Sequence, residues 1–228
     1  YRTLGGLQLL LVLVLFFSRS LWQDSSKKTV KEHLAQKEKP SLKNKALPFA
    51  LFSFFLYCSL EISTGLWAVS YLVEVKHLIP TDAAFYGSLF FLGITSGRMA
   101  SGFVSYRLSN YLLIVLGLLI AFLSIIMLYF APLSIAGFSL LVLGIGCAPI
   151  FPSLIHETPR SFGPENSSRI IGLQMASAYV GSTITPPLFG ILGTLLGMYW
   201  MPLMQMVILL LMVLCIGILI GFTRRNRR

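Results

Sequence analysis

The chain has 228 residues, of which 56% are hydrophobic and only 11% are charged, and its formal net charge is +10. Soluble globular domains carry about 25% charged residues, so this composition excludes an ordinary soluble domain and predicts an all-α membrane protein. Cys58, Cys147 and Cys215 all lie inside apolar stretches, which favours neither a disulfide framework nor a metal site. We expect no cofactor.

Seven apolar segments follow one another along the chain. They cover residues 4–17, 47–73, 83–104, 111–131, 133–155, 170–196 and 202–222. About 20 apolar residues cross a bilayer core as a helix, so the first segment is short for a span. It begins close to Tyr1, with no charged start or small-residue cleavage site before it, and we interpret the chain as a fragment of a longer protein.

Four regions result from this pattern. Residues 1–17 are a partial helix, 18–46 a basic linker, 47–222 a bundle of six helices and 223–228 a basic tail. No aromatic residues interleave the lysines of the linker, so nucleic acid is not an expected partner.

Lysine and arginine placement predicts the orientation of the bundle. If the linker is cytoplasmic, alternating spans also place Arg107, Arg160, Arg169 and the tail inside, and only Arg2 and Lys76 fall outside. We therefore expect a multi-pass protein of the plasma membrane, which is the inner membrane in a bacterium, with linker and C-terminus in the cytoplasm. The bilayer, and its anionic headgroups, would be a partner.

One carboxylate, Glu61, lies near the middle of the second segment. A charge at that depth costs about 2.5–3.5 kcal/mol on insertion scales, so Glu61 is expected to face protein or water. Tyr57, Thr64, Gly65 and Ala68 share its helical face, because positions three and four apart are neighbours. Glu61 is either part of a transport pathway or a protonated group bonded to a neighbouring helix.

The third segment carries Gly93, Gly97 and Ser101 four residues apart, a strip of small residues that predicts close helix packing. Arg98 follows within the strip and Arg107 lies at the predicted cytoplasmic exit. The fourth and seventh segments are oily, and the fourth is expected to face lipid.

Proline interrupts the fifth and sixth segments. Pro149 and Pro152 in the fifth, and Pro186 and Pro187 in the sixth, are expected to kink their helices, because proline removes a backbone hydrogen bond. The adjacent His156 and Glu157 lack a third ligand and are not expected to bind a metal. A polar loop is expected over residues 158–169.

The sixth segment is too polar to face lipid, and its Gln174, Ser177 and Tyr179 are candidate pathway residues. The second, third, fifth and sixth segments thus hold the polar and broken positions, whereas the fourth and seventh are oily. Two sets of three helices of this kind are typical of secondary transporters built from repeats.

This order of segments resembles the C-terminal half of a major facilitator superfamily transporter, helices six to twelve, and in particular the bacterial fucose-permease-like branch. The motifs that carry the resemblance are Glu61-Ile-Ser-Thr-Gly65-Leu-Trp67, Gly97-Arg98 with Gly102 and Arg107, Ala148-Pro149-Ile150-Phe151-Pro152, Gly163-Pro164, and Ile171-Gly172-Leu173-Gln174. They span nearly the whole chain.

The resemblance implies alternating access around a midplane site between two six-helix halves, and an N-terminal half that this chain lacks. The expected pathway residues are Glu61, Tyr57, Thr64, Gln174, Ser177 and Tyr179. The resemblance also implies a cytoplasmic gate in which Arg98 or Arg107 pairs with Glu157 in an outward-open or occluded state and separates from it in an inward-open one; the alternative is that Arg98 extends to lipid phosphates.

The function predicted is secondary active transport of a small polar solute, with a sugar among the candidates, coupled to a proton or a sodium ion. A non-transporting scaffold or sensor on the same fold is the alternative. A membrane enzyme is not favoured, because the few intramembrane ionisable groups lie in different spans without a recognised motif.

Overall fold

The computed structural model describes residues 2–18 and 45–225. The chain divides into two compact units, Tyr1–Ser41 and Leu42–Arg228. The first unit contains helix α1 (Arg2–Phe17). Residues 19–44 of the basic linker and the last three residues of the tail lie outside the described residues.

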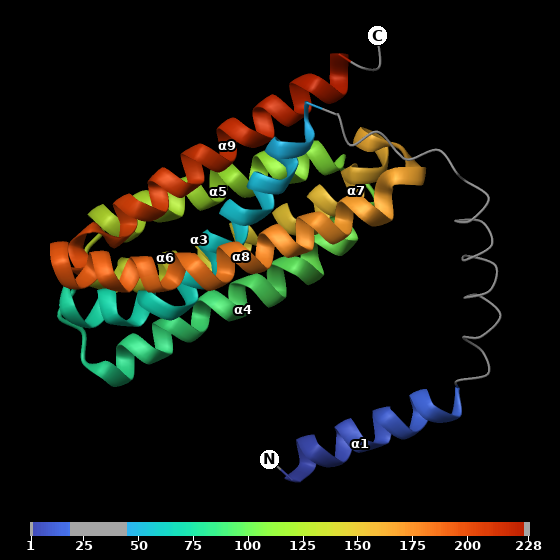
Figure 1. Ribbon diagram of the computed structural model, residues 1–228. Coiled ribbons are helices and arrows are strands. Elements are labelled where there is room, and N and C mark those ends of the chain that lie inside the picture. The colour runs from blue at the N-terminus through green and yellow to red at the C-terminus, as the bar shows by residue number, and fades with distance from the viewer. Residues whose placement is uncertain (1, 19–44, 226–228) are drawn as a thin grey trace. The chain divides into compact units, whose positions relative to one another are not determined.

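The second unit is a bundle of helices that run back and forth along one direction (Figure 1). Its elements are α3 (Leu47–Glu74), α4 (Pro80–Val104), α5 (Asn110–Phe130), α6 (Leu133–Cys147), α7 (Ile150–Phe162), α8 (Pro164–Leu196), the 3₁₀ turn η1 (Met198–Trp200) and α9 (Met201–Arg225). The described part of the chain contains no strand, so the all-α class is confirmed.

Five stretches of the described residues are long and apolar enough to cross a membrane. They are Leu47–Glu74, Asn110–Phe130, Ile135–Phe162, Pro164–Leu196 and Met198–Thr223. Helix α4 has 25 residues but is more polar, because Arg98 and several glycines, serines and threonines interrupt its apolar run. A span of this composition needs protein neighbours to cover its polar groups.

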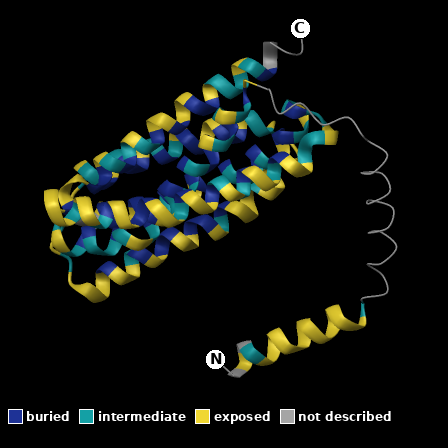
Figure 2. Cartoon of the chain, in the orientation of Figure 1, coloured by how far each residue is buried: buried dark blue, intermediate teal, exposed yellow. Residues whose placement is uncertain are grey.

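Helix α3 packs most extensively against α8 and α9, and α6 lies against both α4 and α5. The buried residues gather between the helices and the exposed ones on their outer surfaces (Figure 2). Phe54, Tyr57, Phe90 and Ile114 are among the fully buried side chains of this core.

The predicted fifth segment is two helices. Helix α6 ends at Cys147 and α7 begins at Ile150, with Pro149 between them and Pro152 in the first turn of α7. Neither proline has an N–H to donate, so the helical hydrogen-bond ladder is interrupted here. The chain nevertheless continues through the break, because Ala148 N–H bonds Gly144 and Ser153 N–H bonds Pro149.

The loop expected over residues 158–169 is wrong. Helix α7 continues to Phe162, and α8 begins at Pro164 after the single residue Gly163, whose φ is +86°. Glycine adopts this left-handed backbone without a Cβ penalty, and proline suits the first position of a helix, so two residues make the whole turn. Pro186 and Pro187 lie inside α8, which runs on past them to Leu196.

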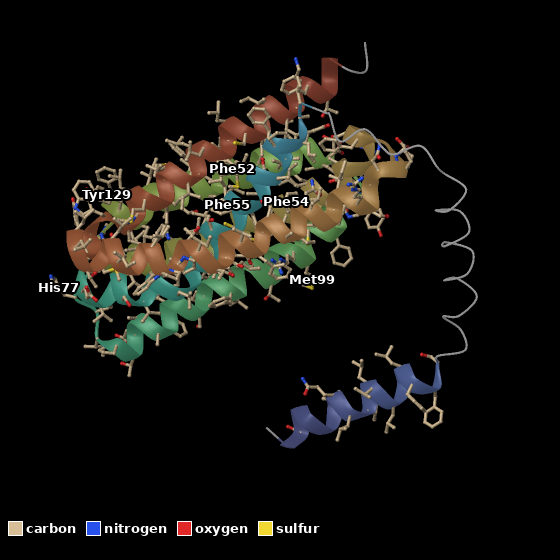
Figure 3. The ribbon with its side chains drawn as sticks, in the orientation of Figure 1. Phe52, Phe54, Phe55, His77, Met99 and Tyr129 are labelled. Atoms are coloured by element: carbon tan, nitrogen blue, oxygen red, sulfur yellow. The ribbon has the colours of Figure 1, made fainter. Side chains whose placement is uncertain are left out.

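Lys76, which the charge bias places on the external side together with Arg2, has a structural role. Its Nζ donates to the carbonyl oxygens of Tyr129 (3.0 Å) and Ala131 (3.1 Å) at the end of α5. The last carbonyls of a helix lack intrahelical partners and carry partial negative charge, so a lysine there is stabilising. Tyr129 lies at that end of the bundle (Figure 3).

Helices α4 and α6 approach each other at glycine. A Cβ at Gly93 would lie 2.2 Å from the carbonyl oxygen of Leu141, and one at Gly144 would lie 2.2 Å from that of Phe90. Both obstacles are backbone atoms, which cannot turn aside. The predicted close packing of the small-residue strip is therefore confirmed at Gly93.

We predict that Gly93→Ala lowers the thermal stability of the purified protein, because overpacking of a tight contact typically costs about 1–3 kcal/mol. The matched control is Gly217→Ala in α9, where a Cβ would meet nothing within 4 Å. Melting followed by tryptophan fluorescence should show a lower midpoint for Gly93→Ala alone. Equal midpoints for the two variants would contradict the prediction.

Candidate functional site

An ion pair joins the middle of α3 to α4. Arg98 Nη2 donates to Glu61 Oε1 at 3.1 Å, and the side chains of Arg98 and Glu61 are 50% and 16% exposed. The Glu61 carboxylate is therefore largely covered, whereas half of the Arg98 side chain stays accessible. The pair compensates the one carboxylate that the sequence places deep in a span.

Three titratable side chains face this pair from the helices that surround it. Tyr57 and Cys58 lie on α3, one turn before Glu61, and Cys147 lies at the end of α6. All three interact electrostatically with Glu61. The Tyr57 hydroxyl is buried and has no hydrogen-bond partner among the described residues. Arg98 is thus the one cation among the described groups around Glu61.

Glu61 lies at the border of an open face of α3. Phe52, Ile62 and Leu66 are exposed, and Phe55 and Cys58 are half-buried, so these residues form a continuous helical stripe. Phe52 and Phe55 stack with ring centroids 5.4 Å apart (Figure 3). We call this stripe the open face of α3.

The other residues that share the predicted stripe of Glu61 point into the bundle. Tyr57, Thr64 and Ala68 are all buried. Gln205 of α9 donates to Thr64 Oγ1 at 2.9 Å, and Thr64 Oγ1 donates to the carbonyl of Leu60. Thr64 is therefore paired inside the core in this structure. The open face of α3 is rotated around the helix axis by about one residue from the face that the sequence predicts for Glu61, Thr64 and Ala68.

The three candidate residues of α8 differ in burial and in hydrogen-bond partners. Gln174 is buried and accepts a hydrogen bond from Thr158 Oγ1 at 3.0 Å, and Ser177 Oγ donates to the carbonyl of Leu51 on α3 at 2.8 Å. Tyr179 is 72% exposed. None of the hydrogen bonds and ion pairs of the described residues joins them to Glu61, with which they are grouped as expected pathway residues.

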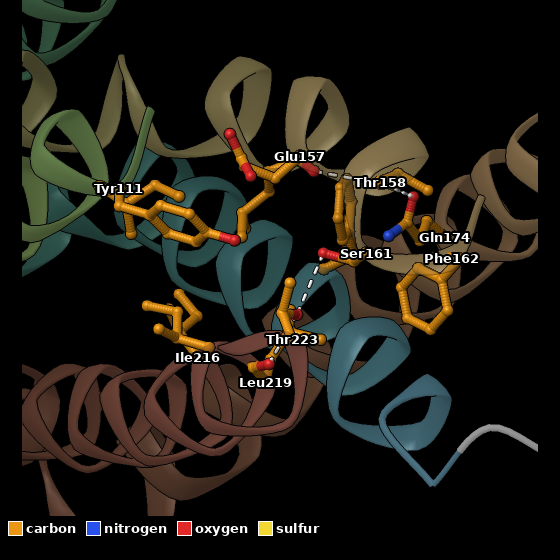
Figure 4. A pocket seen from close by; sticks show the side chains of 13 residues that line it. Tyr111, Glu157, Thr158, Ser161, Phe162, Gln174, Ile216, Leu219 and Thr223 are labelled. Carbon is orange, nitrogen blue, oxygen red and sulfur yellow. Dashed lines mark hydrogen bonds between the residues drawn. The ribbon is translucent and has the colours of Figure 1, made fainter. Parts of the chain in front are cut away.

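Glu157 is held at the predicted cytoplasmic end. Its Oε1 accepts hydrogen bonds from Asn110 Nδ2 at 2.8 Å and from Arg160 Nη1 at 3.0 Å, and its Oε2 is buried without a partner among the described residues. A cavity of about 10 Å³ lies beside it, and Thr158, Gln174 and Thr223 contribute to its wall (Figure 4).

The partners expected for the gate therefore differ from those in this structure. Arg98 pairs with Glu61 and Glu157 pairs with Arg160; Arg107 is exposed and forms no ion pair among the described residues. Glu157 belongs to the same packed bundle as both arginines, and its hydrogen bond from Asn110 joins α7 to α5. Its pairing with Arg98 or Arg107 stays a prediction for another state of the protein.

A groove lies between α4, α5 and α7 on the Arg98 side of the bundle. Its volume is about 200 Å³, and Arg98, Ser101, Asn110 and His156 are among the residues that line it. The described residues that line it include no carboxylate.

Sequence reasoning missed three residues of these networks. Sequence reasoning does not select Asn110 and Arg160 as site residues, because each lies at a helix end, where polar residues are common. Gln205 does have a recognisable sequence signal: it is a single amide in an apolar span, and such groups form hydrogen bonds with neighbouring helices. Trp67, the last residue of the motif that begins at Glu61, donates from its Nε1 to the carbonyl of Pro186 on α8 at 2.9 Å.

No group of three His, Cys, Asp or Glu residues gathers to hold a metal ion within the part of the chain that the structure describes.

The family model that matches this sequence is the Major Facilitator Superfamily, over residues 49–228. The chain belongs to this superfamily. Its fold and family are those of membrane transporters rather than of an enzyme.

Solved transporters have the same fold. The transporter FucP, described in its outward conformation, superimposes with a TM-score of 0.64 at 17% identity over 80% of this chain and 43% of that chain. A variant of the Escherichia coli fucose:proton symporter FucP gives a TM-score of 0.61 with the same identity and coverage. At this identity the likeness establishes the fold.

A curated relative is Bypass of stop codon protein 6 of Saccharomyces cerevisiae. It is 28% identical over 179 residues, which are 72% of this chain and 35% of that protein. The chain therefore spans about a third of the length of this relative and less than half of FucP.

We predict unequal costs for breaking the Glu61–Arg98 pair. Arg98→Gln should destabilise the protein more than Glu61→Gln, because it leaves the better covered charge without a partner. The double variant should be more stable than the sum of the single losses predicts, with a coupling of about 0.5–3 kcal/mol, as for residues in direct contact. Thermal melting of the four proteins gives this cycle. Additive losses would mean that the pair contributes nothing.

Proposed function

We propose that the complete protein is a secondary active transporter, in which this chain supplies one half of an alternating-access machine. Its cargo would be a small polar solute, and its coupling ion a proton or a sodium ion. The observation that carries the proposal is the Glu61–Arg98 pair beside the open face of α3, in a superfamily of transporters.

The physical argument starts from the cost of charge in a membrane. Ionisable groups within spans are expensive and mark ion or substrate pathways by default. Glu61 is not fully enclosed, and Arg98 is half exposed, so the pair can respond to a solute or an ion. A pair kept for packing alone has no need of that access.

A proton is the first choice of coupling ion, because a carboxylate can take up a proton reversibly and the FucP neighbour is named as a fucose:proton symporter. Sodium is the second choice, since carboxylates and carbonyls also bind hard cations. A sugar remains among the candidate solutes. The alternating movement would need a second half, because one bundle has no partner to rock against.

We predict that Glu61→Gln abolishes ion-coupled uptake by the complete protein in proteoliposomes while leaving it folded in the membrane, since glutamine keeps the shape but cannot carry or release a proton. Glu74→Gln is the matched control, because Glu74 is exposed at the end of the same helix. A screen of labelled polar solutes under a proton or sodium gradient supplies the assay. Full uptake by Glu61→Gln would leave the pair a structural role only, and no uptake of any solute would favour the scaffold or sensor.

The orientation is a further part of the proposal: the chain end after α9 faces the cytoplasm of a cell whose plasma membrane holds the protein. Arg107, Arg160 and Arg169 lie near the same end of the spans as that chain end, in agreement with the positive-inside rule.

A protease-cleavable tag fused after Arg228 should therefore be protected in intact cells and cleaved after permeabilisation. A second tag in the α3–α4 turn, after His77, should show the opposite pattern. Cleavage of the C-terminal tag in intact cells would reverse the orientation.

A further inference from the structure

The groove beside Arg98 has an arginine and no carboxylate among the described residues of its lining, together with Asn110, His156 and serine hydroxyls. Its volume of about 200 Å³ is below the roughly 300–1,000 Å³ of pockets for drug-sized ligands, so it suits a small solute.

Arg98 contacts Glu61 through a single nitrogen. The hydrogen bond uses Nη2 and Oε1, whereas a guanidinium has five N–H donors and can bind an oxyanion through two parallel bonds. Half of the Arg98 side chain is exposed and its groove side is accessible. A second oxyanion can therefore approach the guanidinium from the groove.

Glu61 depends on this one cation. Its titratable neighbours are Tyr57 and Cys58 on α3, Cys147 on α6 and Arg98 on α4, and of these only Arg98 carries a charge that favours the carboxylate. An oxyanion that engages Arg98 weakens the compensation of Glu61, and protonation of Glu61 releases Arg98 for the oxyanion. The two events favour each other.

We propose that the transported solute carries an oxyanion, a carboxylate or a phosphate, which binds Arg98 in place of Glu61, and that Glu61 takes up the accompanying proton. The proton comes from solvent, bonds to a Glu61 carboxylate oxygen and leaves again when the pair re-forms. A singly charged solute and one proton then move without net charge. This inference rests on the proposed transport function and names its solute class.

The half-buried thiol of Cys58 reports on the pair, because it lies three residues from Glu61 on the same helix and interacts electrostatically with both charged partners. Bromoacetate and bromoacetamide have nearly the same shape but differ in one carboxylate. In the complete protein, the ratio of their alkylation rates at Cys58 is measured by peptide mass spectrometry and divided by the ratio for glutathione. Dividing by glutathione removes the intrinsic reactivity of the two reagents.

We expect a normalised ratio several-fold above one in the wild type, a larger ratio in Glu61→Gln and a ratio near or below one in Arg98→Gln. The wild-type ratio should rise as pH falls, and Glu61→Gln should remove that pH dependence. Arg107→Gln, which removes an exposed arginine outside the groove lining, should leave the ratio unchanged. Protection of Cys58 by acetate or by inorganic phosphate shows which oxyanion the site prefers.

Equal ratios in the wild type, Glu61→Gln and Arg98→Gln would overturn the proposal. If Cys58 reacts with neither reagent, the same ratios are measured at Ser101→Cys in the groove lining, and equal ratios there would overturn it. If uptake still depends on Glu61 in that case, the transport function stands and the solute is neutral. If no solute is taken up but Cys58 still reacts faster with bromoacetate, the oxyanion site at Arg98 stands and the transport function fails.

Discussion

The close approach of α4 to α6 determines the geometry of the charged site. Backbone meets backbone where Gly93 and Gly144 face the opposite helix, and Gly97 faces Ala148 one turn further along. Without a hydrophobic force between helices in lipid, such van der Waals contact is a main source of association. It also fixes the depth and rotation of α4, so that Arg98, the residue after Gly97, reaches Glu61 on α3.

A second set of interactions ties α3 to the other side of the bundle. Ser59 and Thr185 share a hydrogen bond of 2.7 Å, and Gln205 bonds Thr64. These polar groups are buried, and each would be costly without its partner. Hydrogen bonds from α8 and α9 thus fix the position of α3, the helix that carries Glu61.

Polar groups at the predicted cytoplasmic end also form hydrogen bonds between helices. Asn110 of α5 donates to Glu157 of α7, and Arg160, three residues further along α7, donates to the same carboxylate oxygen. A helix interrupted by proline loses part of its own hydrogen bonding, so contacts between neighbouring elements hold its position. In this structure Glu157 joins α7 to α5 through Asn110, and its role in a gate stays a prediction.

The amino-acid sequence determined the helices, the oily and polar spans and the importance of Glu61, because span length and a carboxylate among apolar residues are local properties. The motifs also predicted the superfamily. The tertiary structure decided the partners from other helices, which are Arg98 for Glu61, Gln205 for Thr64 and Asn110 for Glu157, whereas Arg160 lies three residues from Glu157 on the same helix. Pairing depends on the rotation and depth of each helix relative to its neighbours. Contacts between residues far apart in the chain set both, and helical periodicity along one segment carries no record of them.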